Sequence, residues 1–194
     1  MRVGVLALQG DWAAHRAALA PFGLAVTEVR TAADLVGVDG LILPGGESTA
    51  MLTLMAGNGL AGKLREVVES GCPVLATCAG MILLAREVRR PAQPSLGLLD
   101  VTVERNAYGR QIDSTVTDLA VELPEELGAA TIEGVFIRAP RVVETGPGVR
   151  VIARRGADPV LLRQGNLLAA TFHPELSDRS PVIGLFTRVL GGRR

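Results

Sequence analysis

The chain has 194 residues, of which 48% are hydrophobic, and its 20 basic side chains are balanced by 20 acidic ones. This length suits one domain with a sizeable core rather than two. The zero net charge argues against a nucleic-acid partner, because such proteins usually carry an excess of lysine and arginine. The hydrophobic runs are short and broken, so we expect no membrane span, and the first run lacks a signal-peptide cleavage pattern, which predicts a cytoplasmic protein.

Apolar runs of strand length alternate with helical patterns through the first 88 residues. The expected strands are residues 2–8, 25–29, 40–43 and 74–76. The expected helices are residues 12–22, 31–36, a helix capped by Ser48 or Thr49, residues 60–68, and a helix after residue 78. Fully apolar strands joined by helices are typical of a parallel sheet covered on both faces, so this half predicts a doubly wound α/β fold. In such folds, binding sites lie at the carboxyl ends of the strands.

Shorter and more polar strands follow a proline-rich loop at residues 89–95. They are expected at residues 98–105, 114–121, 135–138, 142–144, 149–154, 160–163 and 167–172. A turn at residues 164–166 makes the last two a hairpin, and we expect this half to extend the same sheet in antiparallel fashion. A C-terminal helix begins at Pro181 with Ser180 as its cap, and the last four residues form a frayed tail. With no linker or repeat visible, residues 1–194 are predicted to form one domain.

Cys78 lies where the apolar run Val74–Ala76 meets the small residues Ala79 and Gly80, ahead of a second apolar run. A buried strand that enters a sharp turn and then a helix is the geometry of a nucleophile elbow, which lifts one side chain above the sheet. Amides at the N-terminus of that helix would stabilise a thiolate. The alternative is that Cys78 is a small buried core residue, as most unpaired cysteines are.

A nucleophilic Cys78 needs a base, and His173 is the better candidate of the two histidines. It follows the strand predicted to end at Phe172, which places it at the same sheet edge as Cys78 if that strand is parallel. Glu175 can fold back onto the other imidazole nitrogen and support the imidazolium, which completes a Cys-His-Glu triad. The alternative is a strand-ending turn with a surface glutamate. We favour the triad.

The other histidine and cysteine are expected to be structural. His15 is spaced from Leu19 and Phe22 as on one helix face, so we expect it to be partly packed on the core and assign it no catalytic role. Cys72 precedes a proline at a strand entry. At about 3.3 Å per residue of strand, Cys72 and Cys78 lie too far apart for a disulfide. Two histidines without a clustered acidic or thiol set make a metal site improbable.

The segment Pro44-Gly45-Gly46-Glu47 ends the third expected strand. It lacks the lysine of a phosphate-binding loop and has a carboxylate where an anion would lie, so phosphate is disfavoured. Two adjacent glycines let backbone amides approach a carbonyl oxygen closely and, with the amide of Ala79, form an oxyanion hole. A plain strand-to-helix turn is the alternative.

Arg105 and Arg138 each end an expected strand, and either guanidinium could bind a carboxylate through two parallel hydrogen bonds. Together with Glu47, an arginine would suit the carboxylate and ammonium groups of an amino acid. The alternative is that both arginines are solvated surface residues, as most arginines are.

Three segments in this order resemble the pattern of class I glutamine amidotransferases: Pro44-Gly45-Gly46, Cys78-Ala79-Gly80 and His173-Pro174-Glu175. Within that family the chain is similar to the glutaminase subunits of pyridoxal 5'-phosphate synthases. This narrower resemblance rests on residues 7–10, 45–49, 76–85, 104–111, 136–140 and 173–176. It implies a flavodoxin-like three-layer sandwich whose mostly parallel central sheet carries an antiparallel extension.

The resemblance also implies a reaction and a partner. Cys78, with His173 and Glu175, would attack the side-chain amide of glutamine, and the amides of Gly46 and Ala79 would stabilise the oxyanion. The residues implied to hold glutamine are Gly46, Glu47, Ser48, Arg105, Ile137 and Arg138. Ammonia would pass to a separate barrel-shaped synthase subunit in a hetero-oligomer, and docking would activate the glutaminase by reorienting the Gly45–Gly46 peptide. No cofactor is expected on this chain.

Two other classes of protein remain as alternatives. A cysteine-dependent peptidase or stress protein of related fold would share the elbow but would not need Glu47, Arg105 and Arg138 together. A non-catalytic regulator would need none of the reactive side chains.

Overall fold

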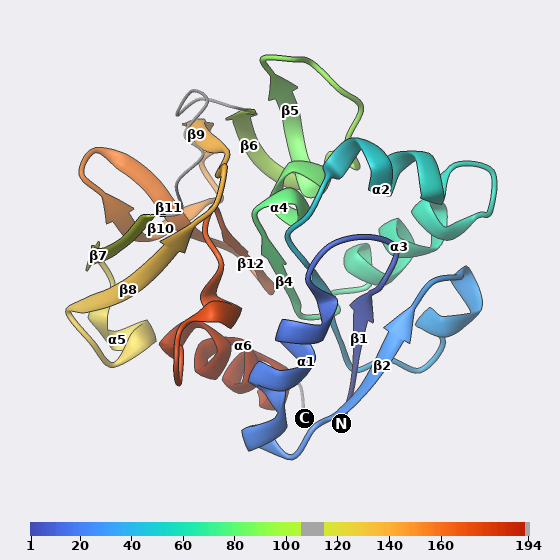
Figure 1. Ribbon diagram of the computed structural model, residues 1–194, viewed down its shortest axis with the longest axis horizontal. Coiled ribbons are helices and arrows are strands. Elements are labelled where there is room, and N and C mark those ends of the chain that lie inside the picture. Colours follow the sequence, from blue (N-terminus) through green and yellow to red (C-terminus); the bar gives the residue numbers. More distant parts are fainter. Residues whose placement is uncertain (106–114, 193–194) are drawn as a thin grey trace.

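The computed structural model describes residues 1–105 and 115–192, and within these ranges the strands form two sheets (Figure 1). The larger sheet has nine strands in the order β2-β1-β3-β4-β12-β11-β10-β7-β8. Their bounds are β1 Arg2–Leu6, β2 Ala25–Val29, β3 Gly40–Leu43, β4 Val74–Thr77, β7 Thr115–Val121, β8 Thr131–Phe136, β10 Arg150–Arg155, β11 Asp158–Gln164 and β12 Leu167–Ala170. The smaller sheet has the order β5-β6-β9, with bounds β5 Ala85–Arg89, β6 Leu99–Glu104 and β9 Arg141–Thr145.

The larger sheet is parallel in one half and antiparallel in the other. Strands β2, β1, β3, β4 and β12 pair in parallel. From β12 onward the pairs β12–β11, β11–β10, β10–β7 and β7–β8 are antiparallel. This arrangement confirms the predicted parallel sheet with an antiparallel extension. It also puts the C-terminal ends of β4 and β12 side by side, with Thr77 paired to Ala170.

Helices and 3-10 turns cover both faces of the larger sheet (Figure 1). The helices are α1 Trp12–Leu19, α2 Ser48–Met55, α3 Leu60–Glu69, α4 Ala79–Leu84, α5 Pro124–Leu127 and α6 Pro181–Gly191, and the turns are η1 Ala20–Phe22, η2 Ala32–Leu35 and η3 Pro174–Leu176. Side chains of α2, α3 and α4 share one hydrophobic cluster with the smaller sheet. Side chains of α1 and α6 belong to a second cluster.

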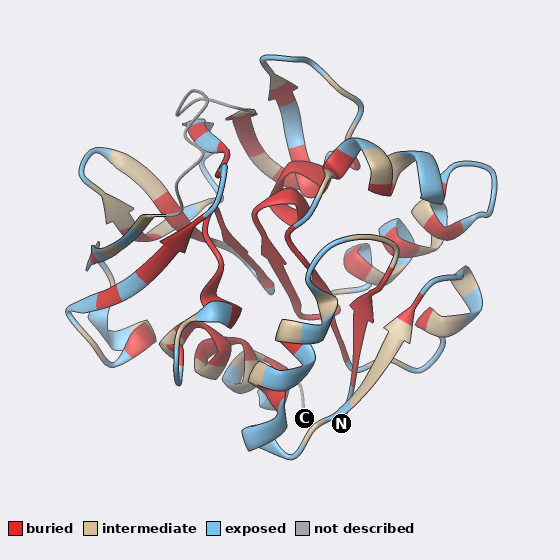
Figure 2. Ribbon diagram, in the orientation of Figure 1, coloured by how far each residue is buried: buried red, intermediate tan, exposed pale blue. Residues whose placement is uncertain are grey.

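The alternation of side chains along the central strands divides the core between these two clusters. Val74 and Ala76 of β4 belong to the first cluster, and Leu75 between them belongs to the second. All four residues of each of the strands β3, β4 and β12 are buried. Figure 2 shows β4 and β12 in red, the colour of buried residues. Burial on both faces explains why these segments are continuous apolar runs, and it makes the fold the predicted three-layer sandwich.

Two strands expected in the extended sheet belong instead to the smaller one. The segments predicted at residues 98–105 and 142–144 form β6 and β9, and β6 pairs with β5 on one side and with β9 on the other. Strand β5 follows α4 directly, where the sequence suggested only more helix and then a loop. Hydrophobic pattern alone cannot say which strands pair, and this explains the error.

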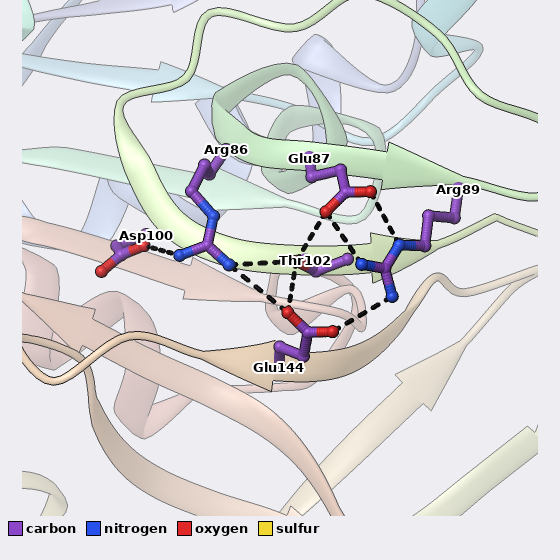
Figure 3. A network of polar contacts seen from close by, with 6 residues as sticks. All are labelled: Arg86, Glu87, Arg89, Asp100, Thr102 and Glu144. Carbon is purple, nitrogen blue, oxygen red and sulfur yellow. Dashed lines mark hydrogen bonds and ion pairs between the residues drawn. The ribbon is translucent and has the colours of Figure 1, made fainter.

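A charged network on the smaller sheet accounts for its polar residues (Figure 3). The hydroxyl of Thr102, a buried residue of β6, lies 3.3 Å from Glu87 and 3.2 Å from Glu144. Arg89 pairs with both carboxylates, at 2.8 Å and 3.1 Å. Arg86 pairs with Asp100 on the other side of the network. Opposite charges on neighbouring strands therefore join β5, β6 and β9.

Several element ends differ from those expected. The helix predicted at residues 12–22 ends at Leu19 and continues as η1, because Pro21 cannot donate the hydrogen bond that a longer α-helix needs. The segment 31–36 is the 3-10 turn η2. The cap of α2 is Glu47 rather than Ser48 or Thr49, since its carboxylate accepts from the Thr49 amide at 3.3 Å.

The second half shows further differences. Strand β8 begins at Thr131, earlier than predicted, α5 was not expected, and the strand before His173 ends at Ala170 rather than Phe172. Pro181 begins α6 as predicted, but Ser180 precedes it without a side-chain capping hydrogen bond. Residue 114, residues 106–111 of one resembling segment and the last two residues of the expected tail lie outside the described ranges.

In the part of the chain that the structure describes, no helix is both long and apolar enough to cross a membrane.

Candidate active site

Cys78 occupies the sharp turn between β4 and α4. Its backbone has φ 47° and ψ −104°, a conformation that residues other than glycine rarely adopt. The Cys78 amide donates to the Ala170 carbonyl at 2.8 Å, which holds the turn against β12. A Cβ atom on Gly80 would lie 2.0 Å from the Leu43 carbonyl oxygen, so only glycine lets α4 pack this closely on β3. The elbow geometry predicted from the sequence is therefore confirmed.

His173 and Glu175 lie at the same sheet edge, just beyond β12. Because β12 is parallel to β4, the chain leaves both strands in the same direction. The His173 amide donates to Val135 at 2.8 Å, and the short turn η3 brings Glu175 back to the imidazole. Nδ1 of His173 lies 2.8 Å from Oε1 of Glu175. Cys78 lines the same cleft as His173 and raises the pKa of the imidazole, so the three side chains form a row in the order Cys78, His173 and Glu175.

A cleft of about 190 Å³ opens over this row. The two reactive side chains and all six residues predicted to hold glutamine line it: Cys78, His173, Gly46, Glu47, Ser48, Arg105, Ile137 and Arg138. Four further residues line the cleft that the sequence did not single out as site residues: Asp11, Ile82, Pro140 and Leu176. Ala79 and Glu175 are not among its lining residues, and both are buried.

The glycine turn after β3 packs tightly on the loop that precedes α1. The Gly45 carbonyl accepts a hydrogen bond from the Asp11 amide at 3.4 Å, and the Gln9 side chain accepts one from the Glu47 amide. Gly46 has φ 151°, and a Cβ atom there would lie 2.9 Å from Gly10 Cα. The direction of the Gly45–Gly46 peptide is thus set by the loop at residues 9–11.

Charged side chains from two distant segments meet at one wall of the cleft. Arg105, at the end of β6, pairs with Glu47 at 3.0 Å. The Glu47 side chain is 47% exposed, whereas that of Arg105 is 15% exposed. The carboxylate is therefore open to solvent, and the guanidinium that holds it is largely buried. Arg138 also lines the cleft and has φ 45°. It directly follows Ile137, whose carbonyl accepts from the Cys78 sulfur at 3.9 Å. The wall therefore offers both a carboxylate and guanidinium groups.

Comparison with known proteins identifies the family. The model of the SNO glutamine amidotransferase family matches residues 5–190. The chain belongs to this family. It is 50% identical over 178 residues to "Pyridoxal 5'-phosphate synthase subunit PdxT" of Thermotoga maritima, covering 92% of this chain and 93% of the relative. The protein of the same name from Koribacter versatilis is 48% identical over 190 residues, covering 98% and 96%.

A solved structure described as "Crystal structure of glutamine amidotransferase" agrees with this assignment. It has a TM-score of 0.88 and 46% sequence identity, and the match covers 97% of this chain and 98% of the other. The fold is therefore that of a glutamine amidotransferase. This family membership disfavours the peptidase, stress-protein and regulator alternatives.

The electrostatics of the amidotransferase site are set by burial and by hydrogen bonds that oppose it. Burial lowers the pKa of His173, but hydrogen bonds and attraction from Cys78 and Glu175 outweigh it and raise the pKa to about 10. Burial raises the pKa of Glu175, but hydrogen bonds from His15 and His173 outweigh it and lower the pKa to about 2. His173 is thus an imidazolium near neutral pH, and Glu175 beside it is a carboxylate.

His15 is placed differently from our expectation. It is fully buried rather than partly packed on the core. Its Nε2 lies 3.1 Å from the Thr77 hydroxyl and 3.4 Å from Oε1 of Glu175. Sequence reasoning missed this contact, although one signal was available: a histidine on the buried face of an amphipathic helix needs a polar partner inside the protein.

Proposed function

We propose that this amidotransferase is the glutaminase subunit of a pyridoxal 5'-phosphate synthase and hydrolyses L-glutamine to L-glutamate and ammonia. The observation that carries the proposal is the single cleft at which Cys78, His173 and the predicted glutamine-binding residues meet. Family membership and the printed names of the relatives support the same activity.

Glutamine binds with its α-carboxylate and α-ammonium groups at the charged wall of the cleft. The guanidinium groups of Arg105 and Arg138 suit the carboxylate, and the Glu47 carboxylate suits the ammonium. Gly46, Ser48 and Ile137 complete the pocket. The side-chain amide is then directed toward Cys78, which lies at the turn between β4 and α4.

The first half of the reaction transfers the glutamyl group to sulfur. The Cys78 thiolate attacks the amide carbon, and the amides of Gly46 and Ala79 hydrogen-bond to the oxyanion that forms. The His173 imidazolium donates its Nε2 proton to the leaving nitrogen as the carbon–nitrogen bond breaks. Ammonia leaves, and a glutamyl thioester remains on Cys78.

The second half regenerates the enzyme. Neutral His173 takes a proton from water, and the resulting hydroxide attacks the thioester carbon. The carbon–sulfur bond breaks, glutamate leaves, and the Cys78 thiolate again faces a His173 imidazolium. Glu175 accepts a hydrogen bond from His173 Nδ1 in both halves and stabilises the positive charge.

Ammonia is the useful product in this proposal. The chain works in a hetero-oligomer with a barrel-shaped synthase subunit, which receives the ammonia and builds pyridoxal 5'-phosphate in the cytoplasm. The names of the relatives, which call them subunits of that synthase, support such a partner. Docking of the synthase would complete the oxyanion hole by reorienting the Gly45–Gly46 peptide.

The deciding experiment measures ammonia and glutamate release from glutamine by the chain alone and with its synthase subunit. We expect slow hydrolysis alone, faster hydrolysis with the synthase, and none from Cys78→Ala under either condition. Incubation with a glutamine-analogue electrophile should label Cys78, located by peptide mass mapping. Activity that persists in Cys78→Ala, or a label on another residue, would disprove the proposed chemistry. A full rate without the synthase would disprove the activation alone.

A further inference from the structure

His15 contacts the proposed triad at Glu175, the last member of the row Cys78, His173 and Glu175. It lies on α1, and its Nε2 is 3.4 Å from the same oxygen, Oε1 of Glu175, that lies 2.8 Å from His173 Nδ1. The side chains of His15 and Glu175 are both 0% exposed. Two imidazoles from distant parts of the chain therefore share one buried carboxylate oxygen.

The chemistry of the carboxylate determines which nitrogens carry protons. An ionised carboxylate only accepts hydrogen bonds, and Glu175 is ionised at neutral pH because its pKa is lowered to about 2. Both Nε2 of His15 and Nδ1 of His173 must therefore carry a hydrogen where they face Oε1. This tautomer of His15 also lets Nε2 donate toward the Thr77 hydroxyl at 3.1 Å.

Two imidazole N–H groups that face one carboxylate oxygen constrain it more than one would. They restrict rotation of the Glu175 carboxylate, which lies on a three-residue turn rather than on a long helix or strand. They also compensate the burial of its negative charge, which would otherwise favour the protonated acid. A protonated or rotated Glu175 would support the His173 imidazolium poorly.

We propose that His15 is a positioning residue that holds Glu175 ionised and aimed at His173. This inference rests on the proposed function, because it concerns the same triad. It assigns His15 no contact with glutamine, since His15 is not among the residues that line the cleft. The competing explanation is that His15 only fastens α1 to the end of β4 through Thr77.

A matched pair of amide variants separates the two explanations. The amide nitrogen of His15→Gln can reach the position of Nε2, whereas that of His15→Asn reaches only that of Nδ1. Both variants bury an amide, so they disturb packing in a similar way. Leu19→Val, a change at a buried core position on the same helix, serves as a control for loosening of α1.

Activity is measured with the full chain and its synthase, and Cys78 reactivity is measured with iodoacetamide on the full chain alone. We expect His15→Asn to lower kcat about 10- to 100-fold, the range typical when the partner that orients an imidazole ligand is removed. Its KM for glutamine should change little, and the rate of Cys78 alkylation at pH 7 should fall. His15→Gln should recover most of the activity, and Leu19→Val should keep it.

A double-mutant cycle supplies the decisive readout. If His15 acts through Glu175, the loss caused by His15→Asn should largely vanish when Glu175→Gln is already present. Equal losses in both backgrounds, or His15→Gln as inactive as His15→Asn, would overturn the inference. An unchanged rate of Cys78 alkylation in His15→Asn would overturn it as well. If Cys78→Ala itself stays active, the proposed function fails instead, and the two failures are thereby distinguished.

Discussion

Gly45 lies so close to His173 that a Cβ atom on it would be 2.3 Å from Cε1 of the imidazole. Glycine is required at position 45 because a side chain would have no space there. An unusual backbone conformation is not the reason, since Gly45 does not have a positive φ. The turn after β3 thus forms a wall against which the proposed catalytic base rests. The neighbouring Gly46, by contrast, needs both its space and its φ of 151°.

Gly45→Ala should therefore displace His173 without unfolding the protein. We expect kcat to fall at least about 10-fold, because the misplaced imidazole can no longer serve Cys78, with a stability loss of about 1–3 kcal/mol from overpacking. Glutamine hydrolysis and denaturant unfolding measure the two effects. Gly62→Ala is the control: it adds a methyl group to α3 in open space and should stabilise by about 0.5–1 kcal/mol. Unchanged activity in Gly45→Ala would show that the imidazole tolerates the contact.

Because the pKa of Glu175 is lowered in the folded chain, the free energy of unfolding should decrease at acid pH. The folded-state pKa of about 2 lies below the ordinary value of 4.5. Between these values the unfolded chain binds a proton at Glu175 that the folded chain does not, so stability is fully present above pH 4.5 and falls as pH decreases toward 2. His173 is protonated in both states there and adds nothing to this slope.

The difference in unfolding free energy between the wild-type chain and Glu175→Gln isolates this contribution. We expect that difference to shrink as pH falls from 4.5 toward 2, in chemical denaturation at several pH values. Glu87→Gln, a change on the exposed charged network of the smaller sheet, provides a comparison at a less buried carboxylate. A difference that stays constant with pH would contradict the lowered pKa of Glu175.

His173 provides a spectroscopic test of the thiolate–imidazolium pair. Its raised pKa of about 10, against an ordinary value of 6.5, means that it should remain doubly protonated at pH 8. Nitrogen NMR of the imidazoles can show this directly, because the chain has only two histidines and His173→Gln assigns the signals. In Cys78→Ala the titration of His173 should move to lower pH, since the hydrogen bond and attraction from Cys78 are lost. A His173 signal that titrates near pH 6.5 in the wild-type chain would rule out the pair.

The parallel half of the fold could be predicted because burial on both faces leaves a strong mark in the sequence. Strands β3 and β4 are continuous apolar runs, and their parallel pairing follows from the helices between them. The parallel pairing of β12 with β4 was not predicted, because the sequence placed that strand in the antiparallel half. The smaller sheet could not be predicted in the same way. Its strands mix buried with more exposed residues, as those of the antiparallel extension do, and no local pattern separates the two groups. Which strands pair depends on contacts between distant segments.

In the candidate site, too, the features with a local sequence pattern could be predicted, and contacts between distant segments could not. Cys78, His173 and Glu175 could be predicted to lie together from local pattern. Cys78 directly follows β4, His173 comes soon after β12, and Glu175 lies two residues beyond His173. His15 was misjudged because its partner Glu175 is 160 positions away and no local pattern links them. The pairing of Arg105 with Glu47 also joins distant segments, and only the resemblance to a known family brought these two residues together before the structure did.

Arg105 should determine the affinity for glutamine rather than the rate of its hydrolysis. The guanidinium is 15% exposed and already beside Glu47 at 3.0 Å, so it is held in place before substrate arrives. Arg105→Lys keeps the charge but loses the paired hydrogen-bond geometry. We expect KM to rise about 10-fold or more with kcat nearly unchanged, because a charged hydrogen bond of about 1.5–3 kcal/mol is lost equally from bound substrate and transition state. Arg154→Lys, which alters an ion pair with Glu122 outside the cleft, should leave both constants as they are. Steady-state kinetics with saturating synthase measures the split, and a fall in kcat at constant KM would place Arg105 in the chemical step instead.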